Sequence, residues 1–362
     1  MLEIPFNDNT SEAYERWQKT PVPLFMKFTF FVCRNADTYT NLSDIELEER
    51  GPYVYEEIRF KQNITVYDDE ISYLENKTYK FRPDLSKHGL SEDDNVTIVN
   101  FPMMGYTLLE PEWTVNNEHD PTTDIWINDP FVRHCNKLKG TDGQFFKPNL
   151  EKGDTIYAFE PQLCRSVYFK YWKESEVQDI DTYRFRVPQE YFQCPLVNKD
   201  NTCYCNRPNI TLCNRNGMLD ISHCQYRSFG APIIMSSPYW NNGDPTLRTQ
   251  FKSELKPLKE LNDDNYGTYL DIEPITGTTL RAYRRMQMSI RISGRDEDEF
   301  KLYYPQLAKT NKSIEYIVPG FWVEETAEAD GDQADKWKSM VGNKVKLGKG
   351  LSIAAITSFL IM

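Results

Sequence analysis

The sequence predicts a mixed fold dominated by β-strands. Tyr and Phe, which favour strands, are abundant at 22 and 20 of 362 residues. The clearest segment, Met286–Ile292, alternates apolar and polar residues at period two. Apolar residues make up 40% of the chain and charged residues 27%, which indicates a globular protein. The length allows one large domain or two ordinary ones.

The first third of the chain predicts a helix followed by strands. Ser11–Lys19 is an amphipathic helix that Pro21 and Pro23 end, and Leu24–Val32 is an apolar strand buried on both faces. Gly51–Lys80 is a β meander. We expect its short strands at Ile64–Tyr67, Ile71–Leu74 and Tyr79–Phe81, separated by turns at Asp68–Glu70 and Glu75–Lys77.

The remaining chain is expected to contain fewer regular elements. Glu110–Thr123 is polar and contains proline, so it predicts a loop. From Asp124 a cysteine-rich half begins, with many turn signals and few long periodic runs, so disulfides must hold it. Later come a strand at Thr268–Ile272, a turn at Pro274–Gly277 and a half-buried strand at Met286–Ile292. Asp332–Val341 predicts a final helix with Trp337 on its apolar side.

The net charge of −12 bears on possible partners. An acidic chain repels phosphate backbones, so no nucleic-acid partner is expected, and the charge fits an ordinary solvated surface.

The glycine pair in Gly140–Gly143 is a turn signature. It lacks the spacing and the Lys-Ser/Thr of a phosphate-binding loop.

Cysteines and glycosylation sequons indicate the compartment. Five of eight cysteines fall between Cys164 and Cys224, a cluster that reads as a disulfide knot or as a metal site. Seven Asn-x-Ser/Thr sequons exceed the roughly three expected by chance. Together these features favour an oxidising compartment. The sequons begin at Asn9, Asn41, Asn63, Asn76, Asn95, Asn209 and Asn311.

The C-terminal run 350–362 is apolar. Its thirteen residues are fewer than the ~20 of a membrane helix, and we interpret them as the first half of one. The alternative is a buried terminal helix or strand. Lys344, Lys346 and Lys349 precede the run and favour a cytoplasmic flank under the positive-inside rule, which conflicts with an extracellular domain before it. No signal peptide is visible at the start.

Metal and catalytic chemistry are disfavoured. A zinc site built from Cys203, Cys205, Cys213 and Cys224 with His134 and His223 has the wrong spacing, because zinc pairs are separated by two to four residues. The histidines, including His88 and His119, fit surface or capping roles better than general bases. Asp271 and Glu273 share one strand face, as acid–base catalysis requires, but such pairs are common at turns. We therefore expect no enzyme, no metal and no cofactor.

A collinear series of motifs runs through the chain. Glu49–Tyr55 reads ERGPYVY, Gly140–Gly143 reads GTDG, and Tyr269–Gly277 reads YLDIEPITG. Together with the further motifs named at the end of this paragraph, this series resembles the class B scavenger receptor family. The resemblance covers nearly the whole chain. The further motifs are Trp17–Pro23, Phe28–Phe31, His134–Asn136, Leu163–Tyr168, Cys203–Cys205, Gly217–Ser222, Gly230–Ser236, Ile317–Pro319 and Trp322.

The resemblance implies a membrane glycoprotein with two anchors and one large ectodomain between them. The implied fold is a large antiparallel β-barrel with short helices and a lipid tunnel. The implied partners are lipids, fatty acids or lipoproteins, and the implied location is the plasma membrane with an extracellular ectodomain. Residues 1–349 would form the ectodomain, with its disulfide-rich half at 124–230, and 350–362 would begin the C-terminal anchor. The sequence does not name ligand-binding residues.

The resemblance also implies disulfide pairs. Cys135 would join Cys203, Cys164 would join Cys224, and Cys205 would join Cys213. Cys33 and Cys194 have no counterpart in the family. They either pair with each other or remain free, and we favour pairing, because a free thiol is unusual in an oxidising compartment.

The chain departs from the family in the interval between Asn100 and His134. The family places a helical apex and some strands there, whereas this chain has only a short polar loop, so we expect the apical bundle to be missing. Because protein ligands dock at that apex, their binding is put in doubt. Alternative functions are a lysosomal trafficking receptor for a soluble enzyme and an insect-type co-receptor for lipid pheromones. A hydrolase using Asp271 or Glu273 is a distant further alternative.

Overall fold

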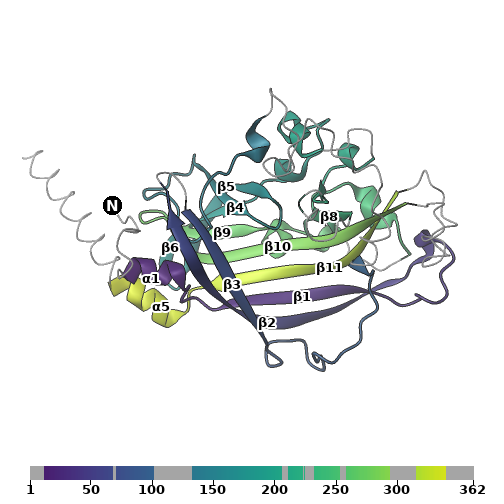
Figure 1. Cartoon of the computed structure of the whole chain (residues 1–362), viewed down its shortest axis with the longest axis horizontal. Coiled ribbons are helices and arrows are strands. Elements are labelled where there is room, and N and C mark those ends of the chain that lie inside the picture. Colours follow the sequence, from purple (N-terminus) through teal and green to yellow (C-terminus); the bar gives the residue numbers. More distant parts are fainter. Residues whose placement is uncertain are drawn as a thin grey trace, which may run out of the picture.

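One curled antiparallel sheet organises the chain (Figure 1). It is seen in a computed structural model that describes residues 12–67, 71–101, 133–205, 211–222, 224, 232–252, 258–293 and 315–339. The strand order is β3-β2-β1-β11-β10-β9-β6-β5-β4, with β8 added on β10 and β7 on β8. The sheet bends into a half-barrel, and β3 and β4 are its two edges.

The strands are β1 Leu24–Cys33, β2 Leu47–Val66, β3 Ile71–Phe81, β4 Thr155–Glu160, β5 Arg165–Val177, β6 Ile180–Arg186, β7 Leu219–Asp220, β8 Ile233–Ser236, β9 Tyr269–Glu273, β10 Thr278–Ser293 and β11 Glu315–Glu328. The α-helices are α1 Glu12–Gln18, α3 Asp263–Tyr266 and α5 Gly331–Trp337. Short 3-10 helices lie at η1 Leu42–Asp44, η2 Arg133–Asn136, η3 Gln189–Phe192, η4 Lys199–Tyr204, η5 Thr211–Asn214, η6 Pro238–Trp240, η7 Pro245–Thr249 and η8 Leu258–Glu260.

The predicted β-dominated antiparallel fold is confirmed, and two local predictions are wrong. The turn expected at Glu75–Lys77 is absent because β3 continues through it, paired residue by residue with β2 from Tyr79 to Leu74. The cysteine-rich half contains the 13-residue strand β5, which the turn signals around it concealed. Both strands were missed because cross-strand pairing outweighs local turn propensity.

The second face of β10 is also buried, contrary to the prediction of a half-buried strand. Met286 and Ile290 lie on one face of the strand, as alternation predicts, and are buried in two separate apolar clusters. Gln287 and Ser289 on the other face are nevertheless 0% exposed. The 3-10 helix η6 covers this side, and the side-chain oxygen of Gln287 accepts a 2.8 Å hydrogen bond from the backbone N–H of Tyr239. A polar residue is tolerated there because its polar atoms are paired.

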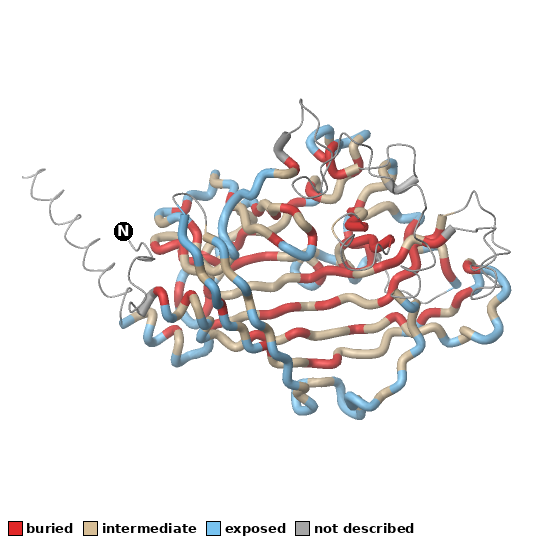
Figure 2. Tube along the Cα trace, in the orientation of Figure 1, coloured by how far each residue is buried: buried red, intermediate tan, exposed pale blue. Residues whose placement is uncertain are grey.

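Burial follows the curl of the sheet. Figure 2 shows the central strands β1, β10 and β11 rich in buried residues, while the β2–β3 hairpin is largely exposed. Along β2 the exposed residues Ile58 and Phe60 alternate with the more buried Glu57, Arg59 and Lys61. The inner face of this hairpin is therefore charged, an inversion of the usual pattern for a half-buried strand.

A buried lysine fixes helix α1 to the sheet. Lys61 is 1% exposed, and its ammonium donates to the carbonyl of Trp17 at 2.8 Å and lies 3.0 Å from the Asp142 carboxylate. The Trp17 indole donates to the same carboxylate at 2.9 Å. Asp142 reaches this position because Gly140 has φ +88° and packs so close to Tyr157 that a Cβ would lie 1.8 Å from its carbonyl oxygen. The GTDG motif is thus a docking turn for α1.

Helices α1 and α5 lie side by side at one end of the half-barrel (Figure 1). The Gln333 side chain of α5 donates a 3.0 Å hydrogen bond to the carbonyl of Pro21, in the link between α1 and β1. Of the helix predicted at Asp332–Val341, the structure shows α5 up to Trp337, which packs on an apolar cluster, and Met340 and Val341 lie outside the described residues. No helix within the described ranges is long and apolar enough to span a bilayer. The predicted loop at Glu110–Thr123 and the run 350–362 lie outside those ranges.

Candidate functional site in the half-barrel

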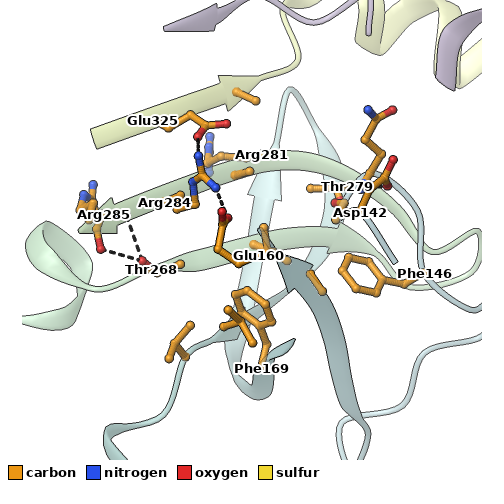
Figure 3. Close-up of a pocket in the computed structure, with 18 of the residues that line it drawn as sticks. Asp142, Phe146, Glu160, Phe169, Thr268, Thr279, Arg281, Arg284, Arg285 and Glu325 are labelled. Carbon is orange, nitrogen blue, oxygen red and sulfur yellow. Dashed lines mark hydrogen bonds and ion pairs between the residues drawn. The ribbon is translucent and has the colours of Figure 1, made fainter. Parts of the chain in front are cut away.

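A partly open cavity of about 690 Å³ lies on the concave side of the sheet. Its apolar lining comes from strands far apart in sequence and includes Leu163, Val167 and Phe169 around β5, Met286 on β10, and Phe146. Figure 3 shows Phe146 and Phe169 on this wall. The volume falls within the range of known small-molecule sites, which is roughly 300–1,000 Å³.

Small residues at inward-facing positions help to leave the space open. Ala158 on β4, Ala282 on β10, and Ala327 and Ala329 at the end of β11 all line the cavity. Leu280, Ala282 and Met286 follow the period-two pattern of one strand face. The cavity extends to the α1–α5 end, where Gln333 and Trp337 line it.

A chain of ion pairs crosses the interior. Arg284 on β10 contacts Glu160 on β4 and Glu325 on β11, as Figure 3 shows. Glu325 also contacts Arg59 on β2, which lies 2.7 Å from Glu57. Lys77 on β3 lies 3.6 Å from Glu57. We call these six residues (Lys77, Glu57, Arg59, Glu325, Arg284 and Glu160) the ionic belt.

The ionic belt links the two edge strands of the half-barrel. Three strands separate β10 from β4 in the sheet, and β1 separates β2 from β11, so the Arg284–Glu160 and Arg59–Glu325 contacts do not join neighbouring strands. The Arg284–Glu325 contact joins paired positions of the neighbouring strands β10 and β11. The belt therefore runs across the concave interior from β3 to β4. Because Arg59, Arg284, Glu160 and Glu325 also line the cavity, the belt is part of its wall.

Burial and the attraction of neighbouring charges shift the pKa values of Glu325 and Arg284 in opposite directions. Burial disfavours the ionised form of Glu325, but the attraction of Arg284 and Arg59 outweighs it and lowers the pKa of this carboxyl below its ordinary value of 4.5. Burial likewise opposes the charge of Arg284, and the attraction of Glu325 and Glu160 raises the pKa of its guanidinium. Glu325 and Arg284 are thus both charged at neutral pH.

The ionic belt predicts that the free energy of unfolding decreases at acid pH. A carboxyl whose pKa is lowered by folding stabilises the fold above its unfolded value of 4.5, and this contribution is lost as the pH falls through the lower, folded value. We expect Glu325→Gln to lower the free energy of unfolding by about 2–3 kcal/mol at pH 7. The difference from wild type should persist at pH 5 and shrink below about pH 4. Urea titrations of both proteins measure it, and a difference that does not depend on pH contradicts it.

Asp271 and Glu273, the carboxylate pair considered for catalysis, are structural. Asp271 is 0% exposed and holds the Arg184 guanidinium at 2.6 and 2.7 Å and Arg281 at 2.9 Å. Glu273 accepts hydrogen bonds from the backbone N–H and hydroxyl of Thr276, at 2.8 and 2.6 Å, and so caps the turn before β10. Neither carboxylate lines the cavity, so the fold gives them no shared site for acid–base chemistry.

The motif around Arg165 is also structural. Its guanidinium lies between the rings of Tyr191 and Tyr204, at 3.9 and 3.6 Å from their centroids. It donates to the carbonyl of Tyr191 at 3.2 Å and to the side chain of Asn201 at 2.8 Å. Arg165 thus joins β5 to η3 and η4 in the cysteine-rich region.

Six cysteines form disulfides in the structure. Cys135 joins Cys203, Cys164 joins Cys224, and Cys205 joins Cys213, the pairs that the resemblance implies. All four cysteines of the alternative zinc site are therefore used, and the described part of the chain holds no group of three or more residues suited to a metal. His119 and His223 lie outside that part, as does the His134 side chain.

The expected disulfide between Cys33 and Cys194 is wrong, because both residues are free thiols. Cys33 ends β1, packs at the edge of the cluster around Phe31, and its thiol lies 3.6 Å from the side-chain oxygen of Asn35. Cys194 is buried in the cysteine-rich region, where its backbone N–H donates to Asn216 at 2.9 Å. The fold thus places the two residues in different regions. Burial raises the pKa of the Cys33 thiol, which keeps it protonated and less reactive.

Four of the predicted glycosylation asparagines are exposed, as glycan attachment requires. These are Asn41, Asn63, Asn76 and Asn95. Asn9, Asn209 and Asn311 lie outside the described ranges. Glycosylation therefore stays a prediction.

Sequence reasoning missed the charged residues of the belt. The usable signal was Arg284, which interrupts the apolar positions Leu280, Ala282 and Met286 on one face of β10. A charge at an inward-facing position predicts a buried partner. The partners themselves were not predictable, because Glu160 lies 124 residues away from Arg284.

Comparison with known proteins identifies the family. The sequence model of the CD36 family matches residues 2–133 and 112–362. Human lysosome membrane protein 2 is 26% identical over 413 residues, covering 92% of this chain and 80% of its own length. Scavenger receptor class B member 1 of Mus musculus is 26% identical over 403 residues, covering 90% and 74%. Sensory neuron membrane protein 2 of Manduca sexta is 25% identical over 425 residues, covering 88% and 78%. The chain belongs to the CD36 family, which includes the class B scavenger receptors.

Proposed function

We propose that this protein is a membrane receptor that binds lipid in the half-barrel cavity and passes it toward a bilayer. The observation that carries the proposal is the cavity itself, about 690 Å³ and walled largely by apolar side chains. Each CH₂ group moved from water into such a cavity gains about 0.8 kcal/mol. Asp271 and Glu273, the carboxylates considered for catalysis, are engaged in structural contacts, which favours a receptor over an enzyme.

The position of the cavity supports transfer toward a membrane. It reaches the end where α1 and α5 lie side by side, and these helices stand next to the two ends of the ectodomain proposed at residues 1–349. A membrane anchor beginning at residue 350 would bring this end of the cavity to the bilayer. Three disulfides and four exposed sequons support an extracellular or luminal setting.

Ala282→Trp tests the lipid function. The indole would fill cavity space next to Leu280 and Arg284, and we expect co-purified lipid, measured by mass spectrometry, to fall at least tenfold. Protein from a secreting animal cell, extracted under mild conditions, is the material. Ala36→Trp is the matched control, because Ala36 lies in the turn after β1, away from the cavity.

Three outcomes are informative. Lipid on wild type and on the control, with loss in Ala282→Trp, supports the cavity as the lipid site. Equal lipid on all three proteins places the lipid elsewhere. A correctly folded wild type that carries no lipid contradicts the proposal for this chain.

We propose the plasma membrane as the location, with lysosomes as the alternative. One similar protein is named a lysosome membrane protein and another a scavenger receptor, so the names of the relatives support both locations. Surface biotinylation and imaging of the tagged protein separate these locations. A purely lysosomal signal would favour the alternative of an enzyme-trafficking receptor.

A further inference from the structure

The ionic belt lies within the wall of an otherwise largely apolar cavity. Leu280 and Ala282 line the cavity on one side of Arg284 along β10, and Met286 lines it on the other. Glu160 and Glu325 are 8% and 9% exposed, so their charges are largely shielded from water. A lipid of cavity size that lies along β10 must therefore pass or face the belt.

The arginines of the belt have no unpaired charge to offer a ligand. Arg284 holds both Glu160 and Glu325, and Arg59 holds both Glu325 and Glu57. The belt contains three carboxylates and two arginines. The third positive charge is that of Lys77 at the outer end of the belt, where its ammonium lies 3.6 Å from the Glu57 carboxylate. Each guanidinium of the belt thus has carboxylate oxygens on both sides.

The other cavity-lining arginines of β10 are occupied as well. Arg281 holds Asp271 and Glu328 at 2.9 and 2.6 Å. Arg285 holds Glu324 at 2.6 Å and two backbone carbonyls of the α3 region at 3.0 and 2.8 Å. Lys336, on the last turn of α5, is solvent-exposed at the end of the cavity.

An ionised lipid headgroup would be disfavoured at the belt. It would lose hydration without gaining a free counter-ion, and it would approach Glu160 and Glu325 at low local dielectric. An alcohol or ester headgroup bears no charge to desolvate and meets no such repulsion. Resting on the proposed lipid function, we infer that the cavity selects lipids with an uncharged headgroup over ionised fatty acids. Glu160 and Glu325 then determine specificity.

Oleyl alcohol and oleate test the inference, because they share one chain and differ in the charge of the headgroup. Binding of each labelled lipid to the full 362-residue chain in phospholipid nanodiscs is measured at pH 7.4, with Ala282→Trp nanodiscs as the background. We expect wild type to bind oleyl alcohol at least tenfold more tightly than oleate. Methyl oleate should follow the alcohol.

The variant Glu160→Gln removes one carboxylate charge and keeps the acceptor for the N–H of Gln162, which lies 3.1 Å away. Arg284 then keeps only Glu325, and its partly released charge becomes available to a ligand. We expect oleate to bind at least tenfold more tightly than to wild type and oleyl alcohol to change less than threefold. Glu48→Gln, which also removes a carboxylate partner of an arginine, Arg34, should change neither, because neither residue lines the cavity.

The outcomes separate the inference from the function on which it rests. Oleate binding to wild type as tightly as oleyl alcohol overturns the inference and leaves lipid binding intact. A wild-type preference that Glu160→Gln does not alter overturns the role of the belt. Failure of both lipids to bind above the Ala282→Trp background overturns the proposed function as well. The wild-type comparison needs no variant, so it decides the selectivity even if Glu160→Gln does not fold.

Discussion

Asp271→Asn is expected to lower the free energy of unfolding by about 3–5 kcal/mol, the cost of breaking a buried ion pair from one side. Asp271 is 0% exposed and is the shared acceptor for Arg184 and Arg281. The Arg184 side chain, only 9% exposed, also stacks on Tyr269 at 3.9 Å and cannot move into water without disrupting β6 and β9. Urea unfolding of the secreted protein measures the loss.

Glu328→Gln is the control for this prediction. Glu328 contacts the same Arg281, but its side chain is 37% exposed, so we expect a loss below about 1 kcal/mol. An Asp271→Asn protein as stable as wild type would contradict the structural role. It would also revive the hydrolase alternative, in which this residue acts chemically.

Removal of the Cys164–Cys224 disulfide, by changing both residues to Ser, is expected to cost about 4 kcal/mol. The bond closes a loop over a sequence separation of 60, and the chain entropy that it removes from the unfolded state grows with loop length. It also joins the start of β5 to the segment after β7, which no strand pairing links directly. Loss of secretion and a lower urea midpoint are the readouts.

The Cys205–Cys213 disulfide provides an internal comparison. Its sequence separation is only 8, so the same double Ser substitution should cost about 2.5 kcal/mol. The two variants have the same chemistry and differ in loop length. Equal losses, or a greater loss for the short loop, would show that native contacts rather than chain entropy determine the effect.

The ionic belt connects stability with ligand choice. The carboxyl of Glu325 keeps its charge into the acid range, because the attraction of Arg284 and Arg59 exceeds the cost of burial. The stabilising contribution of Glu325 is therefore present in mildly acidic compartments as well as in neutral ones. Stability alone therefore does not distinguish the plasma membrane from the lysosome, and the location requires the imaging experiment.

The sequence by itself determined the β-dominated class and the elements whose pattern is local. Period-two alternation located β10, the proline pair ended α1, and the turn residues Pro274–Gly277 marked the connection from β9 to β10. The motif series also identified the family, because it extends along the whole chain and does not depend on any one contact. These features depend on residues near one another in the sequence.

Only the tertiary structure decided which charges meet and where space remains. The contact from Arg284 to Glu160 spans 124 residues and that from Arg59 to Glu325 spans 266, and no periodicity encodes such pairs. The sequence also could not show whether Cys33 and Cys194 meet. Counting cysteines favoured a disulfide between them, but the fold keeps them apart as free thiols. The physical reason is that partner choice and cavity volume depend on how the sheet curls, whereas strand alternation depends only on which face of one strand is buried.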